Sequence, residues 1–218
     1  MITKELIERV RDVGIVLYTC KNYDQKLGRL QLQKLIYLLD TLVLCRYLLS
    51  VKQGHETYHH GPYDQKIQNA VDLLGFWGLV DITDINVQDG KISSNYEIST
   101  YGEEWINELI NKGEGIYQRF ELSRAICDSL SRRNAFNRIR KLVYAEPTYS
   151  RIGQKGYGYN LDLSEYDTNL SSQVVAKMEK IYKTDRISVS DKFVADFLIE
   201  FLEQRASVNY EHDDWIDN

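Results

Sequence analysis

Proline and cysteine are both scarce in this chain. Only two of its 218 residues are proline, so few positions oblige a helix to stop. The three cysteines are odd in number, and Cys20, Cys45 and Cys127 stand far apart within apolar helical patterns. This pattern argues against a disulfide framework and indicates small core residues in a reducing compartment.

Long uncharged apolar runs and an excess of basic charge are missing as well. The most apolar stretch is interrupted by Lys34, Asp40 and Arg46, and charged residues begin at Lys4, which is unlike a secretory signal or a membrane span. The chain has 27 Lys and Arg residues against 32 Asp and Glu residues, a net charge of −5 at pH 7. We therefore expect a cytoplasmic protein that does not associate with membranes.

Apolar residues at helical spacing are what the chain has in quantity. Hydrophobic residues make up 43% of the sequence, which is enough for a substantial core. From Arg29 to Ser50 they surround the helix axis, which predicts a central helix packed on several sides. Their spacing also predicts a first helix from Thr3 to Thr19, with solvent available to Glu5, Glu8, Arg9, Arg11 and Asp12.

A third helix, a hairpin and a fourth helix follow. Asp64 is a suitable N-cap for a helix that ends at Gly78 and turns Ile67, Val71, Leu74 and Trp77 inward. Two β-rich runs flank Asp89-Gly90, a dipeptide suited to a tight hairpin turn. Thr100 and Glu103 then have the spacing of a capping box, which predicts a helix starting at Thr100.

Helix, helix, helix, hairpin, helix is the element order of a winged-helix domain. We expect a mainly α protein with a small β-hairpin wing: a winged-helix-like N-terminal lobe at residues 1–112, a helical C-terminal lobe at 113–206 and an acidic tail at 207–218. In the second lobe a loop rich in glycine and tyrosine is expected between Tyr149 and Tyr166. Helices are predicted from Ile116 to Leu130, Asn134 to Tyr144, Leu170 to Lys183 and Ser190 to Gln204, the last capped by Ser188 or Ser190.

Three segments of the first half resemble a known family. They are RLQLQKLIYLLD at residues 29–40, the HGPYD turn at 60–64 and the aromatic, Gly-Leu-Val ending before the hairpin at 76–80. They are similar to the Panacea and YwgA-like small bacterial proteins, and the LVYAEPTY segment at 142–149 is a looser match. Related chains occur as middle components of ABC-three-component systems and as accessory subunits of Lamassu-type anti-phage defence.

The resemblance implies a non-catalytic accessory subunit that links an SMC or Rad50-like ATPase to an effector such as a nuclease. An antitoxin that neutralises a toxin partner is the alternative. A DNA-binding regulator is a third class, but the helix that would enter the major groove has one cation, Lys66, against Asp64 and Asp72. Such a surface would repel phosphates.

Residues 116–156 have the opposite charge. They include nine Lys and Arg residues and three acids, and the charge reverses again after Ala195, so that the acidic end could fold back onto the basic stretch. A solvated helix face is the plain reading of these cations; a partner protein or nucleic acid is the functional one. The candidate contact residues are Arg132, Arg133, Arg140, Lys141, Tyr149, Arg151 and Trp215.

No grouping in the sequence indicates catalysis, a metal or a cofactor. His55, His59 and His60 lie near a Gly-Pro turn with only Glu56 as a nearby ligand, so we interpret them as exposed or capping turn residues. Asp84 and the Asp89-Gly90-Lys91 segment are similar to a nuclease motif but are explained by the hairpin turn. The glycines between residues 153 and 158 lack the pattern of a phosphate-binding loop. We expect a protein that is not an enzyme.

Overall fold

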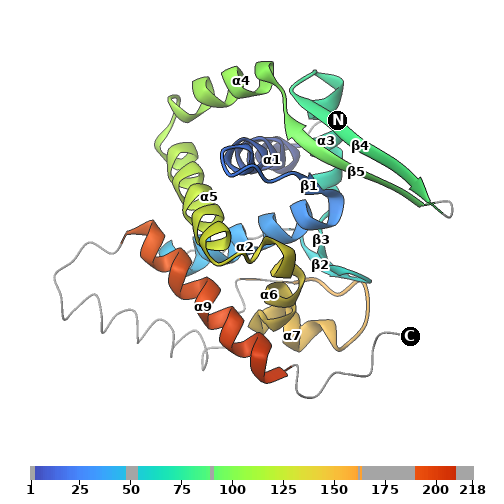
Figure 1. Ribbon diagram of the computed structural model, residues 1–218, viewed down its shortest axis with the longest axis vertical. Coiled ribbons are helices and arrows are strands. Elements are labelled where there is room, and N and C mark those ends of the chain that lie inside the picture. Colours follow the sequence, from blue (N-terminus) through green and yellow to red (C-terminus); the bar gives the residue numbers. More distant parts are fainter. Residues whose placement is uncertain (1–2, 48–53, 89–90, 162, 164–189, 210–218) are drawn as a thin grey trace.

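The protein is mainly helical, with small antiparallel sheets (Figure 1). The computed structural model describes residues 3–47, 54–88, 91–161, 163 and 190–209. Its helices are α1 (Lys4–Lys21), α2 (Arg29–Tyr47), α3 (Gln65–Phe76), α4 (Thr100–Ile110), α5 (Glu114–Arg132), α6 (Ile139–Ala145), α7 (Pro147–Gly153) and α9 (Asp191–Asn209), with a short 3-10 turn at Phe136–Arg138. Its strands are β1 (Leu27–Gly28), β2 (Glu56–Tyr58), β3 (Gly61–Tyr63), β4 (Val80–Gln88) and β5 (Lys91–Ile98).

The predicted hairpin is formed by β4 and β5. The two strands pair antiparallel from Val80 opposite Ile98 to Gln88 opposite Lys91, and β1 adds to β5, so the strand order is β1-β5-β4. The register shifts between Thr83 and Asn86, where Asp84 has a positive φ of 51°. This bulge bends the outer strand β4. The expected turn dipeptide, Asp89-Gly90, lies outside the described residues.

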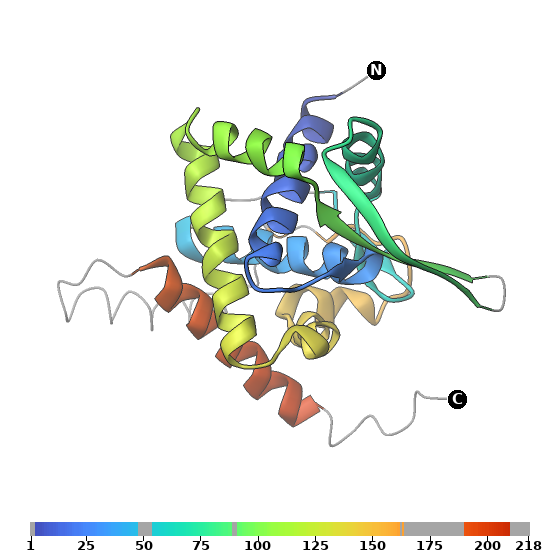
Figure 2. The same cartoon turned by 45° about the horizontal axis from the view of Figure 1, so that its top comes forward.

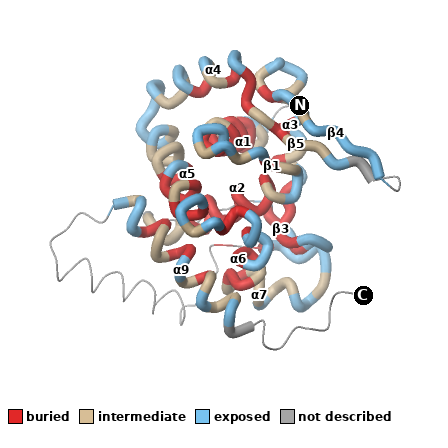
Figure 3. Tube along the Cα trace, viewed as in Figure 1, coloured by how far each residue is buried: buried red, intermediate tan, exposed pale blue. Residues whose placement is uncertain are grey.

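Helix α2 is central, as its apolar pattern predicted: all residues from Leu32 to Leu42 are buried, and the helix packs on α1, α5, α6 and α9. Helix α1 lies beside it. It packs on α2, α3, α4 and α5, while the β4–β5 hairpin projects from the body (Figures 1 and 2). Figure 3 marks its middle as buried, and the apolar core is continuous from the first half of the chain into α5, α6 and α9. Val13, Leu35 and Leu74 belong to the same core as Leu122, Leu142 and Leu202.

Most helix starts are those expected from the sequence. Asp64 caps α3 by accepting a hydrogen bond from the Lys66 backbone N–H, and Ser190 accepts one from Phe193 at the start of α9. The cap of α4 is different: Ser99, rather than Thr100, accepts from the Gly102 N–H, while its hydroxyl donates to the Gly78 carbonyl. Ser99 therefore also fastens the turn that leads into β4.

One side-chain position and the start of one loop differ from the sequence prediction. Trp77 was expected on the inner face of α3, but it follows the last turn of the helix and is exposed, since the chain turns outward at Gly78 with φ +70°. The expected Tyr149–Tyr166 loop overlaps a helix, α7, which runs from Pro147 to Gly153. This helix forms because Pro147 suits a first helical turn and the Glu146 carboxylate accepts a hydrogen bond from the Tyr149 N–H. The predicted Leu170–Lys183 helix lies outside the described residues.

Within the described ranges, no helix combines the length and the apolar character that crossing a membrane requires.

Candidate functional site

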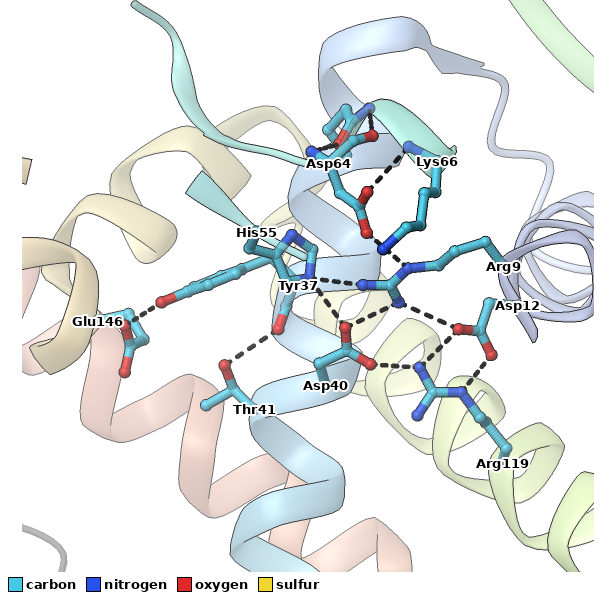
Figure 4. Close-up of polar contacts among 11 residues, drawn as sticks. Arg9, Asp12, Tyr37, Asp40, Thr41, His55, Asp64, Lys66, Arg119 and Glu146 are labelled. Carbon is cyan, nitrogen blue, oxygen red and sulfur yellow. Dashed lines mark hydrogen bonds and ion pairs between the residues drawn. The ribbon is translucent and has the colours of Figure 1, made fainter. Parts of the chain in front are cut away.

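A cluster of charged side chains is buried where four helices meet. We call it the Arg9 cluster. Helix α1 contributes two of its members, α2 and α5 one each, and two come from the segment before α3 (Figure 4). The members are Arg9, Asp12, Asp40, His55, Asp64 and Arg119.

The Arg9 guanidinium is the centre of this cluster. Only 1% of the residue is exposed, and its nitrogens reach three carboxylates: Asp64 at 2.8 Å, Asp40 at 2.9 Å and Asp12 at 3.1 Å. Burial by itself would lower the pKa of Arg9, but these three carboxylates outweigh it and raise the pKa above its ordinary value. Arg9 therefore remains charged and joins α1 to α2 and to the start of α3.

Arg119 supplies the second cation, from α5. It pairs with Asp12 and Asp40, so these two aspartates each bridge two arginines. Burial would raise the pKa of the Asp40 carboxyl, but Arg9 and Arg119 hold that pKa well below its usual range. Two arginines and three aspartates thus share one buried network, in which each charge has an opposite charge within hydrogen-bonding reach.

His55 completes the network as a neutral ring. Its Nε2 lies 2.8 Å from Asp40 and 3.2 Å from an Arg9 nitrogen, and its Nδ1 is buried without a hydrogen-bond partner in the described part of the chain. Burial lowers the pKa of His55; the hydrogen bond to Asp40 opposes this shift, and the nearby Arg9 charge adds to it. The Nε2–H tautomer fits best, because it donates to the Asp40 carboxylate and leaves Nδ1 as a bare acceptor.

A second buried polar pair lies on the other side of α2. The Tyr37 hydroxyl donates to the Glu146 carboxylate at 2.5 Å, and the Tyr37 ring meets His55 edge-on (Figure 4). Burial raises the pKa of Glu146, although Tyr37 and the backbone N–H groups of α7 favour the carboxylate. This pair fixes the start of α7 against α2.

The Arg9 cluster is arranged to position helices. The carboxylates surround the Arg9 guanidinium, and the described residues hold no group of three or more His, Cys, Asp or Glu side chains arranged to hold a metal. Breaking such a network is costly, whereas an intact one fixes which elements meet. We therefore interpret it as the scaffold that sets α1, α2, α3 and α5 relative to one another.

The sequence interpretation missed this cluster. Arg9 and Asp12 were expected in solvent and are buried, and His55 was taken for an exposed or capping turn residue and is fully buried, whereas His59 and His60 are exposed. One signal was present: Arg9 continues the stripe of Val13 and Val16 at helical spacing. A charged residue on the apolar stripe of a helix that packs on several sides indicates a buried partner.

Large apolar side chains gather on the hairpin and at its base. Ile82, Ile85 and Val87 of β4 are 54%, 66% and 63% exposed. At the base of the hairpin, Phe76 is 85% exposed and Tyr101 is 73% exposed. The hydrogen bonds of Ser99 to Gly78 and Leu79 bring the end of α3 to the start of α4. We call this the hairpin surface: Phe76, Trp77, Ile82, Ile85, Val87 and Tyr101.

The polar groups around the hairpin surface are mostly neutral or acidic. Lys26 pairs with Glu97 at 2.7 Å and with Asp84 at 3.3 Å, which fastens β1 to the hairpin, and Asp81 and Asp72 are exposed. On α3, Gln68 donates to Asp72. The half-buried Lys66 runs beside Asp64 (Figure 4), so the basic residue of this helix is turned toward the Arg9 cluster.

Several candidate contact residues of the basic stretch have partners within the chain. Arg132 pairs with Asp128 and with Asp196 of α9, and Arg133 pairs with Glu200 and Glu203 of α9. Three acids of α9, Asp196, Glu200 and Glu203, therefore pair with the basic stretch, as the charge pattern suggested, while the acids after residue 209 lie outside the described residues. Arg140 lies over the Tyr144 ring, which stacks on Tyr149, while Lys141 and Arg151 are exposed on α6 and α7 and Trp215 lies outside the described residues.

Comparison with protein-family models, curated proteins and solved structures finds no match to this chain.

Proposed function

We propose that the protein is a non-catalytic accessory subunit that docks on a partner protein through the hairpin surface. The main support for this proposal is that Ile82, Ile85 and Val87 are exposed along one strand. Phe76 and Tyr101 are exposed at the base of the same hairpin. Exposed apolar side chains that gather in one region mark an interaction site more often than isolated ones do. The hairpin takes the place of the wing in a winged-helix-like lobe.

The strand β4 offers a specific way to bind. It is the outer strand of the sheet β1-β5-β4, and a partner strand that adds to its free edge would pair with backbone groups and cover the apolar side chains. The bulge at Asp84 confines regular pairing to short segments, which limits self-association. Because Asp72 and Asp81 are exposed nearby, the matching partner segment combines apolar with basic residues.

The same charges favour a protein over DNA as the partner. The outward side of α3 presents Gln65, Asn69 and Asp72, and Lys66 is turned toward Asp64. Phosphate contacts need clustered cations, which this helix lacks in the described structure. A DNA-binding regulator is therefore the less favoured class.

The resemblance to Panacea and YwgA-like proteins supports a more specific form of the proposal. In it, the chain is the accessory subunit of an anti-phage defence complex and links an SMC or Rad50-like ATPase to an effector. The Arg9 cluster suits this role, because it holds the elements around the hairpin in fixed positions while a partner binds. An antitoxin would use the same surface to cover a toxin.

The test is co-purification of the tagged chain with the products of its neighbouring genes. We expect an SMC or Rad50-like ATPase to be recovered with the wild type, and recovery to fall about tenfold or more in I85S/V87S, because each exposed side chain buries apolar area on binding. Circular dichroism should give the same helix content for both proteins, since neither side chain belongs to the core.

The matched control is Y117S/F193S, which removes two large side chains of 50% and 39% exposure from α5 and α9. It should recover the ATPase as well as the wild type does. Equal recovery by I85S/V87S would contradict docking through the hairpin. Recovery of a small toxin and no ATPase would instead establish the antitoxin alternative, and binding of promoter DNA without a protein partner would establish the regulator.

A further inference from the structure

The glycine- and tyrosine-rich segment after α7 lies against strand β2 (Figure 1). The Thr57 N–H donates to the Tyr159 carbonyl at 2.8 Å, and the Gly158 N–H donates to the Thr57 carbonyl at 2.8 Å. The Thr57 hydroxyl donates to the Gly156 carbonyl at 2.6 Å and accepts from the Tyr159 N–H. Gly156 and Gly158 have φ of +114° and +77°, a conformation that glycine adopts without strain. Backbone contacts to β2 therefore fix the positions of the tyrosines in this segment.

Aromatic rings from β2, β3 and this segment contact one another in succession. Between ring centroids, Tyr63 lies 5.1 Å from Tyr58, and Tyr58 lies 5.1 Å from His59. His59 in turn lies 4.0 Å from Tyr157. We call these four residues the ring row. Tyr63 is buried, whereas Tyr58 is 45% and Tyr157 62% exposed and His59 is exposed as well, so the row presents aromatic rings to solvent.

An exposed cation stands at each end of the ring row. The Arg29 guanidinium lies 5.6 Å above the Tyr63 ring and donates to the Tyr63 hydroxyl at 2.9 Å. At the other end, Lys155 is exposed two residues before Tyr157. In the described part of the chain, no carboxylate pairs with Arg29 or Lys155. One acid, Glu56, is exposed on the same side of β2 as Tyr58, because side chains alternate along a strand.

We propose that the ring row and its two flanking cations bind single-stranded nucleic acid. Unpaired bases stack on exposed aromatic rings whatever their sequence, and cations beside the rings contact the phosphates. Arg29 uses one nitrogen on Tyr63 and has further N–H groups to donate to phosphate oxygens. Glu56 can accept a hydrogen bond from a base amino group. The site is separate from the hairpin surface and does not depend on the protein partner proposed there.

The spacing of the rings favours bases over a proline-rich peptide. Such peptides dock in grooves that aromatic side chains line. His59 and Tyr157 contact each other directly, as do Tyr58 and His59, which leaves no room for a proline ring between them. A base needs no such groove, since it stacks on the outer face of a ring. The cations at both ends also complement a phosphate backbone, which a proline-rich peptide lacks.

Fluorescence anisotropy of a labelled single-stranded thymidine oligonucleotide, titrated with the full chain, tests the site. We expect binding that weakens as salt rises, and a Kd about fivefold or more higher in Tyr157→Leu, because leucine offers no flat ring for stacking. Tyr157→Phe keeps the ring and should bind like the wild type. Arg29→Gln removes one phosphate contact and should reduce the slope of log Kd against log salt by about 0.7.

Two matched controls remove the same kinds of side chain elsewhere: Tyr117→Leu an exposed tyrosine of α5, and Lys112→Gln an exposed cation after α4. Both should bind like the wild type, and circular dichroism should give every variant the same helix content, since all the altered side chains are exposed.

Three results would overturn a single-strand site at the ring row. The first is no binding at about 100 μM protein, where even weak non-specific complexes form. The second is equal binding of a duplex, whose bases are already stacked on one another. The third is a Kd in Tyr157→Leu, or a salt slope in Arg29→Gln, that equals the wild-type value. Binding of a polyproline peptide in place of the oligonucleotide would also overturn it and assign the rings to a protein partner.

Discussion

Replacing Arg9 by methionine removes the guanidinium that three buried carboxylates share, while much of the side-chain volume is kept. Asp12 and Asp40 still pair with Arg119, but Asp64 loses its bond to the Arg9 Nε and keeps the hydrogen bond from the Lys66 backbone. Removing one partner of a buried ion network costs about 3–5 kcal/mol. Domains are stable by only about 5–15 kcal/mol, so the variant should fold but unfold much more readily.

The cost should depend on pH in a defined direction. In the wild type the lowered pKa of Asp40 contributes stability that is present above the pKa of an unfolded aspartate, about 4, and is lost only well below it. Arg9→Met removes one of the two arginines that lower the pKa of Asp40, so that pKa should be higher in the variant than in the wild type. A carboxyl with a raised pKa costs the fold less once it is protonated, so the deficit should shrink as the pH falls from 7 to 4.

Urea unfolding followed by circular dichroism at pH 7, 5.5 and 4 measures this deficit. Arg11→Met is the matched control. Arg11 is a half-buried arginine of the same helix and is not among the residues that bond to Arg9. Its replacement should change the free energy of unfolding by less than about 1 kcal/mol. A stabilising role of the buried Arg9 network is contradicted if Arg9→Met costs no more than Arg11→Met, or if its deficit grows on acidification.

Three further predictions concern other buried groups. Lys34→Met should stabilise the protein at pH 7 by up to about 3 kcal/mol, because a lysine whose pKa is lowered from 10.5 to about 8 destabilises the fold below pH 8 and no longer does so above pH 10.5. Urea unfolding should therefore show a smaller gain in stability at pH 10 than at pH 7. An equal gain at both pH values would contradict the lowered lysine pKa as its cause. Cys20 and Cys127 are buried with their sulfurs 3.7 Å apart, and burial raises the pKa of Cys20. N-ethylmaleimide should therefore label Cys45 first and the other two cysteines only in urea, as measured by intact mass. Equal labelling of all three in the native protein would be inconsistent with this core. Gly102→Ala places a Cβ 2.1 Å from the Leu79 carbonyl oxygen and should lower the free energy of unfolding, measured with heat or urea, by about 1–3 kcal/mol. Gly113→Ala places a Cβ that meets nothing within 4 Å and should leave that free energy nearly unchanged.

The sequence correctly shows an excess of cations after residue 116, but the structure gives several of these cations acidic partners within the chain. The excess of cations is real, and the acids that balance it come from α9, more than sixty residues away along the chain. Arg132 and Arg133 therefore have carboxylate partners within the molecule. Charge counted over a local window cannot register partners that only tertiary packing brings close.

Local chemistry determined the elements. Apolar spacing predicted the helices from Thr3, Arg29, Ile116 and Ser190 to within a few residues, and Asp64 and Ser190 act as the expected caps, because spacing and capping are contacts between near neighbours in the chain. The cap of α4 was assigned one residue late, since Ser99 and Thr100 offer the same hydroxyl and only the turn at Gly78 distinguishes them.

The packing of the helices determines which polar groups are buried and which of them contact one another. Arg9 meets Asp64 across 55 residues, Asp40 meets Arg119 across 79, and Lys34 shares its enclosure with Tyr144. The sequence already contained each of these charges, but their burial depends on α1 lying between α3 and α5, a packing that helical spacing does not specify. The sequence by itself therefore determined a mainly helical protein with a β-hairpin, and the packing of its helices determined where the charges can act.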